Sequence, residues 1–404
     1  WLRGVPKLAA VFCPGLVSSL RMRIVEFIEH VDFAIGGPPR AVVDLVRVLH
    51  RRGHDVTLAT TTAKDVPPAW LQGDGPAVLV LPRPSLPGGF FRNTQLAELE
   101  QLLRNADVLH MHGVWERTNI GVSKLARRLG IPWVVTLRGM LDDWNMAQRG
   151  RKKRLYLRAG GRRVLEDAAS VQCTAEGELA QSHKWFPRGN PRVIPNLMDL
   201  AEFETLRGPE LAHARWPILK QEGPNLLFLS RLDVKKGIEH LLEAMPRLVE
   251  AHPALQLFVA GPGDESYVGS LKRLAESKGV LDRTHFTGQV GGEEKWSLYE
   301  ACDMFALPSS QENFGFVQFE SLACETPVMT TTLVDTWKEI VDSGGGIAVS
   351  QSADAIVEGI SDLLGDPEAL TSMGQAGRRW IFECMSVDHI VGQIEAMYRD
   401  AAAG

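Results

Sequence analysis

The chain has 404 residues and a net charge of −5 at pH 7, with 45% hydrophobic and 23% charged residues. This length predicts two or three domains, and this composition is typical of a soluble globular protein. The negative charge argues against a general nucleic-acid binder, because such a protein carries a basic surface. Five scattered cysteines indicate neither a disulfide framework nor a zinc site, as expected of a reduced, intracellular protein. The sequence contains no run of about 18 apolar residues, the length that a membrane-spanning helix needs.

Residues 1–21 are expected to form a loosely attached extension. Two positive charges precede an apolar stretch there, as in a signal peptide, but Pro14 and Gly15 interrupt it and no small-x-small cleavage site follows. A targeting segment is the alternative. The first regular element is predicted to begin at Met22.

From Met22 onward, β-rich segments alternate with helical patterns such as 39–53 and 121–130. Strands separated by helices of about 10–15 residues indicate βαβ units and a parallel sheet. The first domain is assigned to residues 22–204. Its predicted strands are 22–29, 54–61, 77–82, 107–113, 132–139, 170–175 and 192–196.

The alternation starts again after a less regular segment at residues 198–224. A second doubly wound domain is therefore predicted, beginning near residue 205. Two such domains that face each other leave a cleft at the carboxyl ends of both sheets, where α/β proteins bind ligands. The predicted strands of the second domain are 225–231, 255–263, 283–290, 304–309 and 326–331.

Glu312 and Glu320 are separated by seven residues that include an aromatic-glycine-aromatic run. Gly315 is expected near a helix start, where free N–H groups and the positive end of the dipole attract phosphate. If one helix carried both glutamates, eight steps of ~1.5 Å would place them about 12 Å apart. The two carboxyl groups of a retaining glycosidase must lie only about 5–5.5 Å apart. The pair suits a ligand with hydroxyls at both ends and a phosphate in the middle, such as a nucleotide sugar; the alternative is two ordinary exposed glutamates.

Two loops carry candidate phosphate-binding groups. Arg231 and Lys236 follow the first strand of the second domain and can hold a diphosphate as paired cations, although a solvated charged loop is the alternative. Gly36 and Gly37 lie between a strand and a helix of the first domain, where glycine allows close backbone approach. Taken alone, these glycines indicate only a βα turn.

Together these segments resemble the retaining glycosyltransferases of family 4. The likeness covers nearly everything after Met22, in the order of the family, and its most specific part is residues 309–330. It implies the GT-B fold, an α/β architecture of two doubly wound Rossmann-like domains facing across a cleft. The first domain would bind the acceptor, residues 205–385 would bind the nucleotide sugar, and a last helix in residues 386–404 would cross back to the first domain. The segments that carry the resemblance are 36–58, 230–245, 258–265, 286–290 and 301–331.

The resemblance also implies a donor site. Glu312 would contact the hexose hydroxyls and Glu320 the nucleotide ribose, while backbone amides around Asn313, Phe314 and Gly315 would face the sugar and diphosphate. Arg231 and Lys236 would bind the diphosphate. The main chain near Gln289 and Val290 would contact the base, and Gly36 and Gly37 would lie at the phosphate and acceptor side.

His110 and His112 alternate at the end of a predicted strand, and we expect them to point to opposite faces of the sheet. The resemblance places His112 in the cleft beside the transferred sugar, as a catalytic residue. His110 is expected to be structural, and His54 is expected to be a turn residue without chemistry.

The chain departs from the family pattern at two positions. Arg138 stands where many relatives carry a histidine, and resembles a subgroup in which an arginine meets an anionic acceptor or a donor phosphate. Leu197 replaces the usual glycine after Pro195 and Asn196, which changes the turn between the domains.

The segment 149–163 holds eight Lys or Arg residues and no acidic residue. It is either a solvated helical face or a contact with anionic lipid head groups or a lipid-diphosphate acceptor. Each basic residue near a charged membrane contributes about 1 kcal/mol. Leu155, Tyr156 and Leu157 offer limited insertion, so such a contact would be peripheral.

We therefore expect a cytoplasmic enzyme that transfers a sugar from a UDP- or GDP-sugar to a saccharide or lipid-linked acceptor in polysaccharide or glycolipid synthesis. The resemblance implies retention of configuration, no cofactor and no obligatory metal, because Arg231, Lys236 and a helix amino end would neutralise the diphosphate. A nucleotide-sugar epimerase of the same fold and a non-catalytic nucleotide-binding protein remain alternatives. A dehydrogenase ranks lower, because no G-x-G-x-x-G opens the first helix.

Overall fold

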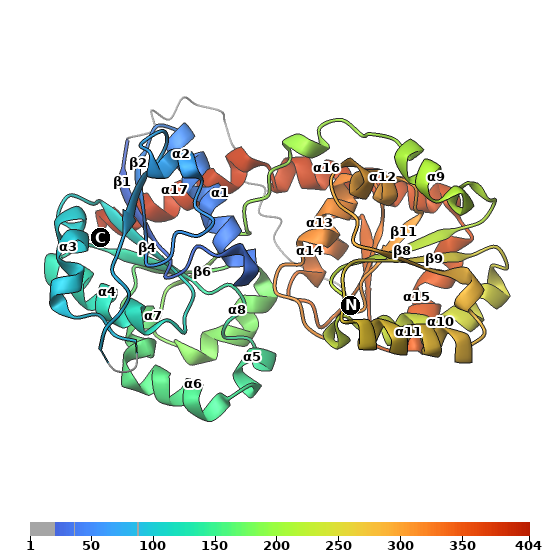
Figure 1. Cartoon of the computed structure of the whole chain (residues 1–404), viewed down its shortest axis with the longest axis horizontal. Helices are drawn as coiled ribbons and strands as arrows, with labels where there is room; N and C mark the ends of the chain where they lie inside the picture. The colour runs from blue at the N-terminus through green and yellow to red at the C-terminus, as the bar shows by residue number, and fades with distance from the viewer. Residues whose placement is uncertain (1–20, 36, 87–88) are drawn as a thin grey trace, which may run out of the picture.

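The computed structural model describes residues 21–35, 37–86 and 89–404. The expected extension lies outside these ranges apart from Arg21, and so does Gly36. Two parallel sheets with helices on both faces form two lobes (Figure 1). The predicted α/β architecture of two Rossmann-like domains is therefore confirmed. Among the described residues, no helix combines the length and apolar character that crossing a bilayer requires.

The first sheet has seven strands in the order β3-β2-β1-β4-β5-β6-β7, all paired in parallel. Its strands are β1 (Arg23–Phe27), β2 (Asp55–Thr60), β3 (Ala77–Val80), β4 (Val108–His112), β5 (Trp133–Thr136), β6 (Ser170–Cys173) and β7 (Pro191–Val193). The helices of this lobe are α1 (Gly37–Arg51), α2 (Pro68–Leu71), α3 (Ala97–Leu103), α4 (Arg117–Leu129), α5 (Asp143–Ala147), α6 (Gly150–Tyr156), α7 (Arg162–Glu166) and α8 (Glu176–Ser182).

The second sheet has six parallel strands in the order β10-β9-β8-β11-β12-β13. The last of them, β13, was not predicted. The strands are β8 (Asn225–Leu229), β9 (Gln256–Ala260), β10 (Thr284–Gly288), β11 (Met304–Ala306), β12 (Val328–Thr331) and β13 (Gly346–Val349). The helices are α9 (Glu210–Arg215), α10 (Ile238–Ala251), α11 (Glu265–Ser277), α12 (Glu293–Glu300), α13 (Phe316–Ala323), α14 (Trp337–Asp342), α15 (Ala353–Leu364), α16 (Pro367–Cys384) and α17 (Val387–Ala403).

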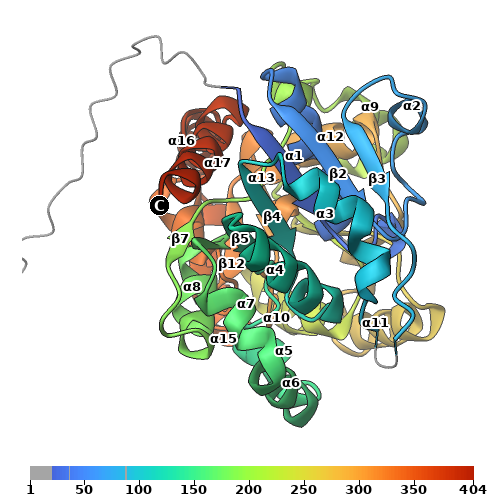
Figure 2. The ribbon, with the colours of Figure 1, turned by 90° about the vertical axis from the view of Figure 1, so that its left-hand side faces the viewer.

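The last helix, α17, leaves the second lobe and packs on α1, β4 and β5 of the first (Figures 1 and 2). Ser386 caps its amino end, where the serine hydroxyl accepts a hydrogen bond from the backbone N–H of His389. His54 is buried, with Nε2 3.0 Å from Glu395 Oε1 of α17, so this turn residue also attaches the helix to the first lobe. The domain boundary near residue 205 stays a prediction; it falls between the two sheets.

Side chains of β4 alternate between two cores. Leu109 and Met111 join the core that contains α4, which covers one face of the first sheet (Figure 2). Val108 joins the other core, which contains α1 and α17 and continues into the second lobe. His110 and His112 follow Val108 in steps of two, so both lie on the α17 side. The prediction that they point to opposite faces is therefore wrong, because residues two apart on a strand share a face.

Candidate active site

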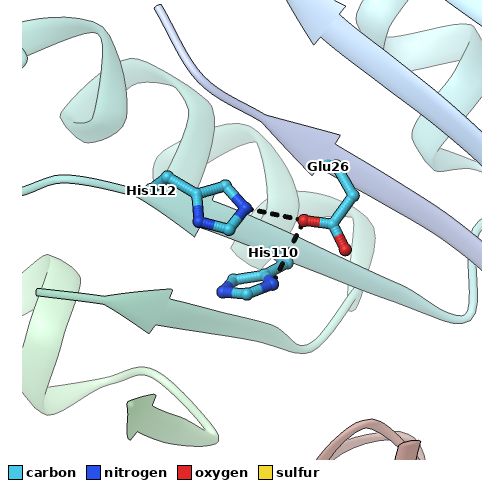
Figure 3. Close-up of side chains that lie close together, drawn as sticks. All are labelled: Glu26, His110 and His112. Carbon is cyan, nitrogen blue, oxygen red and sulfur yellow. Dashed lines mark hydrogen bonds and ion pairs between the residues drawn. The ribbon is translucent and has the colours of Figure 1, made fainter. Parts of the chain in front are cut away.

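A buried carboxylate on β1 joins the two histidines of β4 (Figure 3). His112 Nε2 lies 2.7 Å from Glu26 Oε2, and His110 Nδ1 lies 3.1 Å from the same oxygen. The two imidazole centroids are 4.0 Å apart. All three side chains are fully buried. The carboxylate therefore holds both rings from one side, at the carboxyl end of β4.

Both ring nitrogens of His110 lie beside hydroxyl groups. The Tyr398 hydroxyl donates to Glu26 Oε1 at 2.7 Å, and its oxygen lies 2.6 Å from His110 Nδ1. The Thr136 hydroxyl donates to Gln172 Oε1 at 2.6 Å, and its oxygen lies 2.6 Å from His110 Nε2. These contacts fix the orientation of the His110 ring beside the Glu26 carboxylate.

His112 is a neutral imidazole. An NH2 nitrogen of Arg138 lies 3.3 Å from His112 Nδ1, and a guanidinium can only donate, so Nδ1 accepts and Nε2 donates to Glu26. Burial and the neighbouring His110 lower the pKa of His112 to about 3, against the opposing effect of Glu26. Burial raises the pKa of Glu26, but the charge of His110 and the hydrogen bonds from both histidines outweigh it and hold that pKa well below its usual range.

Arg138 adds a half-buried cation beside His112. Its backbone is left-handed, with φ at 55°, at the carboxyl end of β5. One terminal nitrogen donates to Asn196 Oδ1 at 2.6 Å, whereas Nε has no hydrogen-bond partner among the described residues. Burial lowers the pKa of Arg138 to about 10, while Glu178 and Glu26 oppose that shift. Arg138 remains charged and has an N–H group free for an anion.

The second lobe presents Glu312 and Lys236 as a mutual ion pair. Glu312 lies in the loop before α13, and its carbonyl accepts a hydrogen bond from the Asp335 N–H at 2.9 Å. Gly315 adopts φ at 69° and precedes the first residue of α13, which confirms the helix start predicted near it. Only Glu320 lies inside the helix, so the two glutamates flank the amino end of α13.

Glu320 lines a cavity of about 510 Å³ between the lobes, together with Gly37 of α1 and Phe316 of α13. Its Oε2 lies 2.5 Å from Lys295 Nζ and accepts from the Tyr299 hydroxyl at 3.2 Å. The structure therefore places the implied ribose-binding glutamate and one of the first-domain glycines on the same cavity.

The other predicted donor residues lie around this region without forming one contact network. Arg231 is exposed after β8 and forms no ion pair with the described residues. Gln289 is exposed and Val290 half-buried, between β10 and α12. Phe314 is buried and stacks on Phe319 at 4.6 Å between centroids, so its side chain belongs to the core.

The loop that carries Glu312 packs against the first lobe. Asn313 Oδ1 accepts from the Thr174 hydroxyl at 3.2 Å, and Gln311 Nε2 donates to Asp142 Oδ2 at 2.7 Å. A Cβ on Gly139, next to Arg138, would lie 2.7 Å from Asn313 Cβ. The structure therefore brings the Glu312–Gly315 loop against the loop that carries Arg138.

Sequence reasoning missed Glu26 and Tyr398. A charged residue in the middle of an apolar strand was the available signal for Glu26. No comparable signal marked Tyr398, because it lies 372 residues from Glu26 in the sequence.

Glu26, His110 and His112 offer one carboxylate oxygen and two ring nitrogens within 4.8 Å of one another, which is a donor set that transition metals accept. Each of these atoms already has a hydrogen-bonding partner inside the protein. The geometry is therefore that of a satisfied hydrogen-bond network.

Two family models match the chain. The model of glycosyl transferases group 1 matches residues 213–380, and the glycosyl transferase 4-like domain matches residues 36–197. This chain belongs to the group 1 glycosyl transferases. It is 29% identical to the alpha-monoglucosyldiacylglycerol synthase of Streptococcus pneumoniae over 76% of this chain and 70% of that protein. It is 28% identical to the D-inositol 3-phosphate glycosyltransferase of Salinispora arenicola over 96% of this chain and 93% of that protein.

Solved structures share the fold. Anabaena Alr3699/HepE in complex with UDP matches with a TM-score of 0.74 and 18% identity, over 94% of this chain and all of that chain. Sucrose-phosphate synthase from Thermosynechococcus elongatus matches with a TM-score of 0.70 and 23% identity, over 95% of this chain and all of that one. The predicted GT-B fold and family are confirmed.

Proposed function

We propose that this glycosyltransferase moves a sugar, with retention of configuration, from a nucleoside diphosphate sugar to a hydroxyl of a saccharide or lipid-linked acceptor. The observation that carries the proposal is the packing of the Glu312–Gly315 loop, with its Lys236 ion pair, against the loop that holds Arg138 beside His112. Relatives named for the synthesis of a glycolipid and for the glycosylation of D-inositol 3-phosphate support transfer to an acceptor hydroxyl.

In this proposal, Glu312 binds hexose hydroxyls, and Lys236, Arg231 and the amino end of α13 stabilise the departing diphosphate. The bond between the anomeric carbon and the phosphate oxygen breaks while the acceptor oxygen bonds to the same face. The acceptor proton passes to the leaving phosphate. Because protein cations neutralise that phosphate, we propose that transfer needs neither a metal nor a cofactor, and assays with and without EDTA test this.

His112 and Arg138 form the first-lobe wall of the reaction site in this proposal. His112 stays neutral, and Glu26 and Arg138 engage both of its ring nitrogens. In this proposal it therefore lies beside the transferred sugar as a group that holds Arg138 in place, and it does not act as an acid. Arg138 offers its unpartnered Nε–H to a donor phosphate or an anionic acceptor. Closure of the lobes around these groups excludes water and limits hydrolysis of the donor.

Thermal unfolding with UDP, GDP, ADP and no ligand tests the donor site. At 100 times the dissociation constant a ligand adds about 2.7 kcal/mol, or roughly 5–11 °C. We expect one nucleoside diphosphate to raise the midpoint of the wild type but not of Glu320→Ala. The matched control Glu276→Ala, at an exposed position of α11, should shift like the wild type. Absence of a shift with all three nucleotides would contradict the proposal.

We also propose a peripheral contact between the segment 149–163 and an anionic membrane on the cytoplasmic side. The basic side chains of this segment form no ion pair with the described residues, and Leu155 is 67% exposed. In a sedimentation assay, vesicles containing phosphatidylglycerol should bind the wild-type protein. A variant with Arg151, Lys152 and Arg154 changed to Glu should not bind. The control, with exposed Lys272, Arg273 and Lys278 in and directly after α11 changed to Glu, should bind as the wild type does. Equal binding by both variants would favour a solvated helical face.

A further inference from the structure

Lys295 holds the glutamate that the proposed function assigns to the nucleotide ribose. Its Nζ lies 2.5 Å from Glu320 Oε2, and both side chains are largely buried, at 17% and 16% exposure. Lys295 and Tyr299 both lie on α12, four residues apart, so one helix places an ammonium and a hydroxyl against the same oxygen. The Tyr299 hydroxyl shares its hydrogen with the Val317 carbonyl oxygen, 3.0 Å away. The contacts from α12 fix the orientation of the carboxylate.

The second oxygen of Glu320 is left for a ligand. Among the described residues, Oε1 receives no hydrogen bond, while the side chain lines the interdomain cavity with Trp296 and Phe316. The ammonium of Lys295 also has capacity to spare, because it carries three N–H donors and gives one to Glu320. Its Nζ lies 4.6 Å from the centroid of the Trp296 ring, which keeps the ammonium beside the cavity wall.

A carboxylate and an ammonium side by side match the chemistry of a hydroxyl. A hydroxyl donates one hydrogen bond, which a carboxylate accepts, and its oxygen accepts another, which an ammonium donates. A vicinal diol presents two such groups next to each other. We infer that Lys295 and Glu320 together bind the ribose diol of the donor nucleotide, with Lys295 as a further specificity-determining residue. This inference rests on the proposed function.

Isothermal titration of the full chain with UDP, GDP and ADP, and with the 2′-deoxy and 3′-deoxy analogue of the nucleotide that binds, tests the assignment. The wild type should bind at least one deoxy analogue about tenfold more weakly than the ribonucleotide, because a charged hydrogen bond is lost. Lys295→Met should bind the ribonucleotide more weakly by a similar factor. It should also lose most of the difference in affinity between the ribonucleotide and its deoxy analogue. The control Lys278→Met, at an exposed position after α11, should behave as the wild type.

Lys295→Gln keeps N–H donors, so its affinity for the ribonucleotide should lie between those of the wild type and Lys295→Met. This variant also provides a test if the methionine variant folds poorly. If Glu320→Ala weakens the nucleotide while Lys295→Met and Lys295→Gln bind as the wild type does, the assignment of Lys295 is overturned and the proposed function stands. If none of the three nucleotides binds the wild type, both are overturned.

Discussion

The Tyr398 hydroxyl lies 2.7 Å from Glu26 Oε1, across 372 residues of sequence. The same carboxylate holds His112 through its other oxygen. The last helix of the chain therefore reaches the group that orients the candidate catalytic histidine. Although the chain enters α17 from the second lobe, the side chains of this helix complete the interior of the first.

Tyr398→Phe should lower the free energy of unfolding by about 1–3 kcal/mol, because it leaves a fully buried carboxylate oxygen and the buried ring of His110 without their shared partner. Urea denaturation measures the change. Tyr267→Phe removes a hydroxyl that donates to Glu239 at 2.7 Å in a half-buried setting, where water replaces it, and should cost much less. Equal losses in the two variants would contradict the network.

His112→Ala should reduce sugar transfer about 10²-fold, because Arg138 loses the ring that holds it in place for the transition state, while the thermal shift with nucleotide is kept. Exposed His389→Ala is the control. Because the pKa of His112 is lowered to about 3, His112 should add no inflection to the wild-type rate between pH 5 and 8. An inflection that disappears in His112→Ala would show that this imidazole titrates.

Asp335, buried between the lobes, should make stability fall as pH rises. Burial, with the charges of Glu178, Asp142 and Glu339, raises its pKa to about 8 from an ordinary 3.8, against a hydrogen bond from Asn313. The folded protein therefore keeps a proton that the unfolded chain has lost. Its stabilising effect is complete below pH 3.8 and is lost as pH rises through about 8, with a slope of about 1.4 kcal/mol per pH unit in between.

Denaturation of Asp335→Asn at pH 6, 7 and 8 should show a shallower decline than the wild type, because the titrating carboxyl is gone. The exposed control Asp342→Asn should keep the wild-type slope. Parallel curves for Asp335→Asn and the wild type would show that Asp335 is ionised in the folded protein.

Gly177→Ala should open the contact between the lobes. A Cβ at Gly177, in α8, would lie 2.5 Å from the backbone oxygen of Asp335 in the second lobe, and neither backbone can yield without moving its domain. Small-angle scattering should show a larger radius of gyration, and transfer should slow. Relative to glycine, alanine stabilises a helix by about 1 kcal/mol. The control Gly392→Ala lies in α17, where an added Cβ would have no atom within 4 Å, so it should leave stability unchanged or raise it.

The alternation of buried strands and amphipathic helices was readable because each parallel strand is an apolar run bounded by turns. β13 was missed because Gly344 and Gly345 lead into a short strand that starts at Gly346, and its pairing with β12 defines it. The helix start near Gly315 was readable from local chemistry. The shared face of His110 and His112 was also within reach of the sequence, since it follows from the two-residue period of a strand.

The partners of the site were not readable from the sequence. Glu26 meets His112 across 86 residues, and Glu312 meets Lys236 across 76. Sequence spacing carries no information about such contacts until the order of the strands is known. Lys295 lies 25 positions before Glu320 on a different helix, and only the packing of α12 against α13 brings the two charges together.

The position of α17 has a consequence for synthesis on the ribosome. The seven strands of the first sheet end at Val193, yet the helix that covers α1, β4 and β5 is translated only after the strands of the second sheet. Until it emerges, the nascent first lobe exposes the apolar surface that α17 later covers and keeps the Glu26 carboxylate without its tyrosine. We expect this half-made lobe to be the state of the chain that most needs a chaperone, because exposed apolar surface makes such intermediates aggregate.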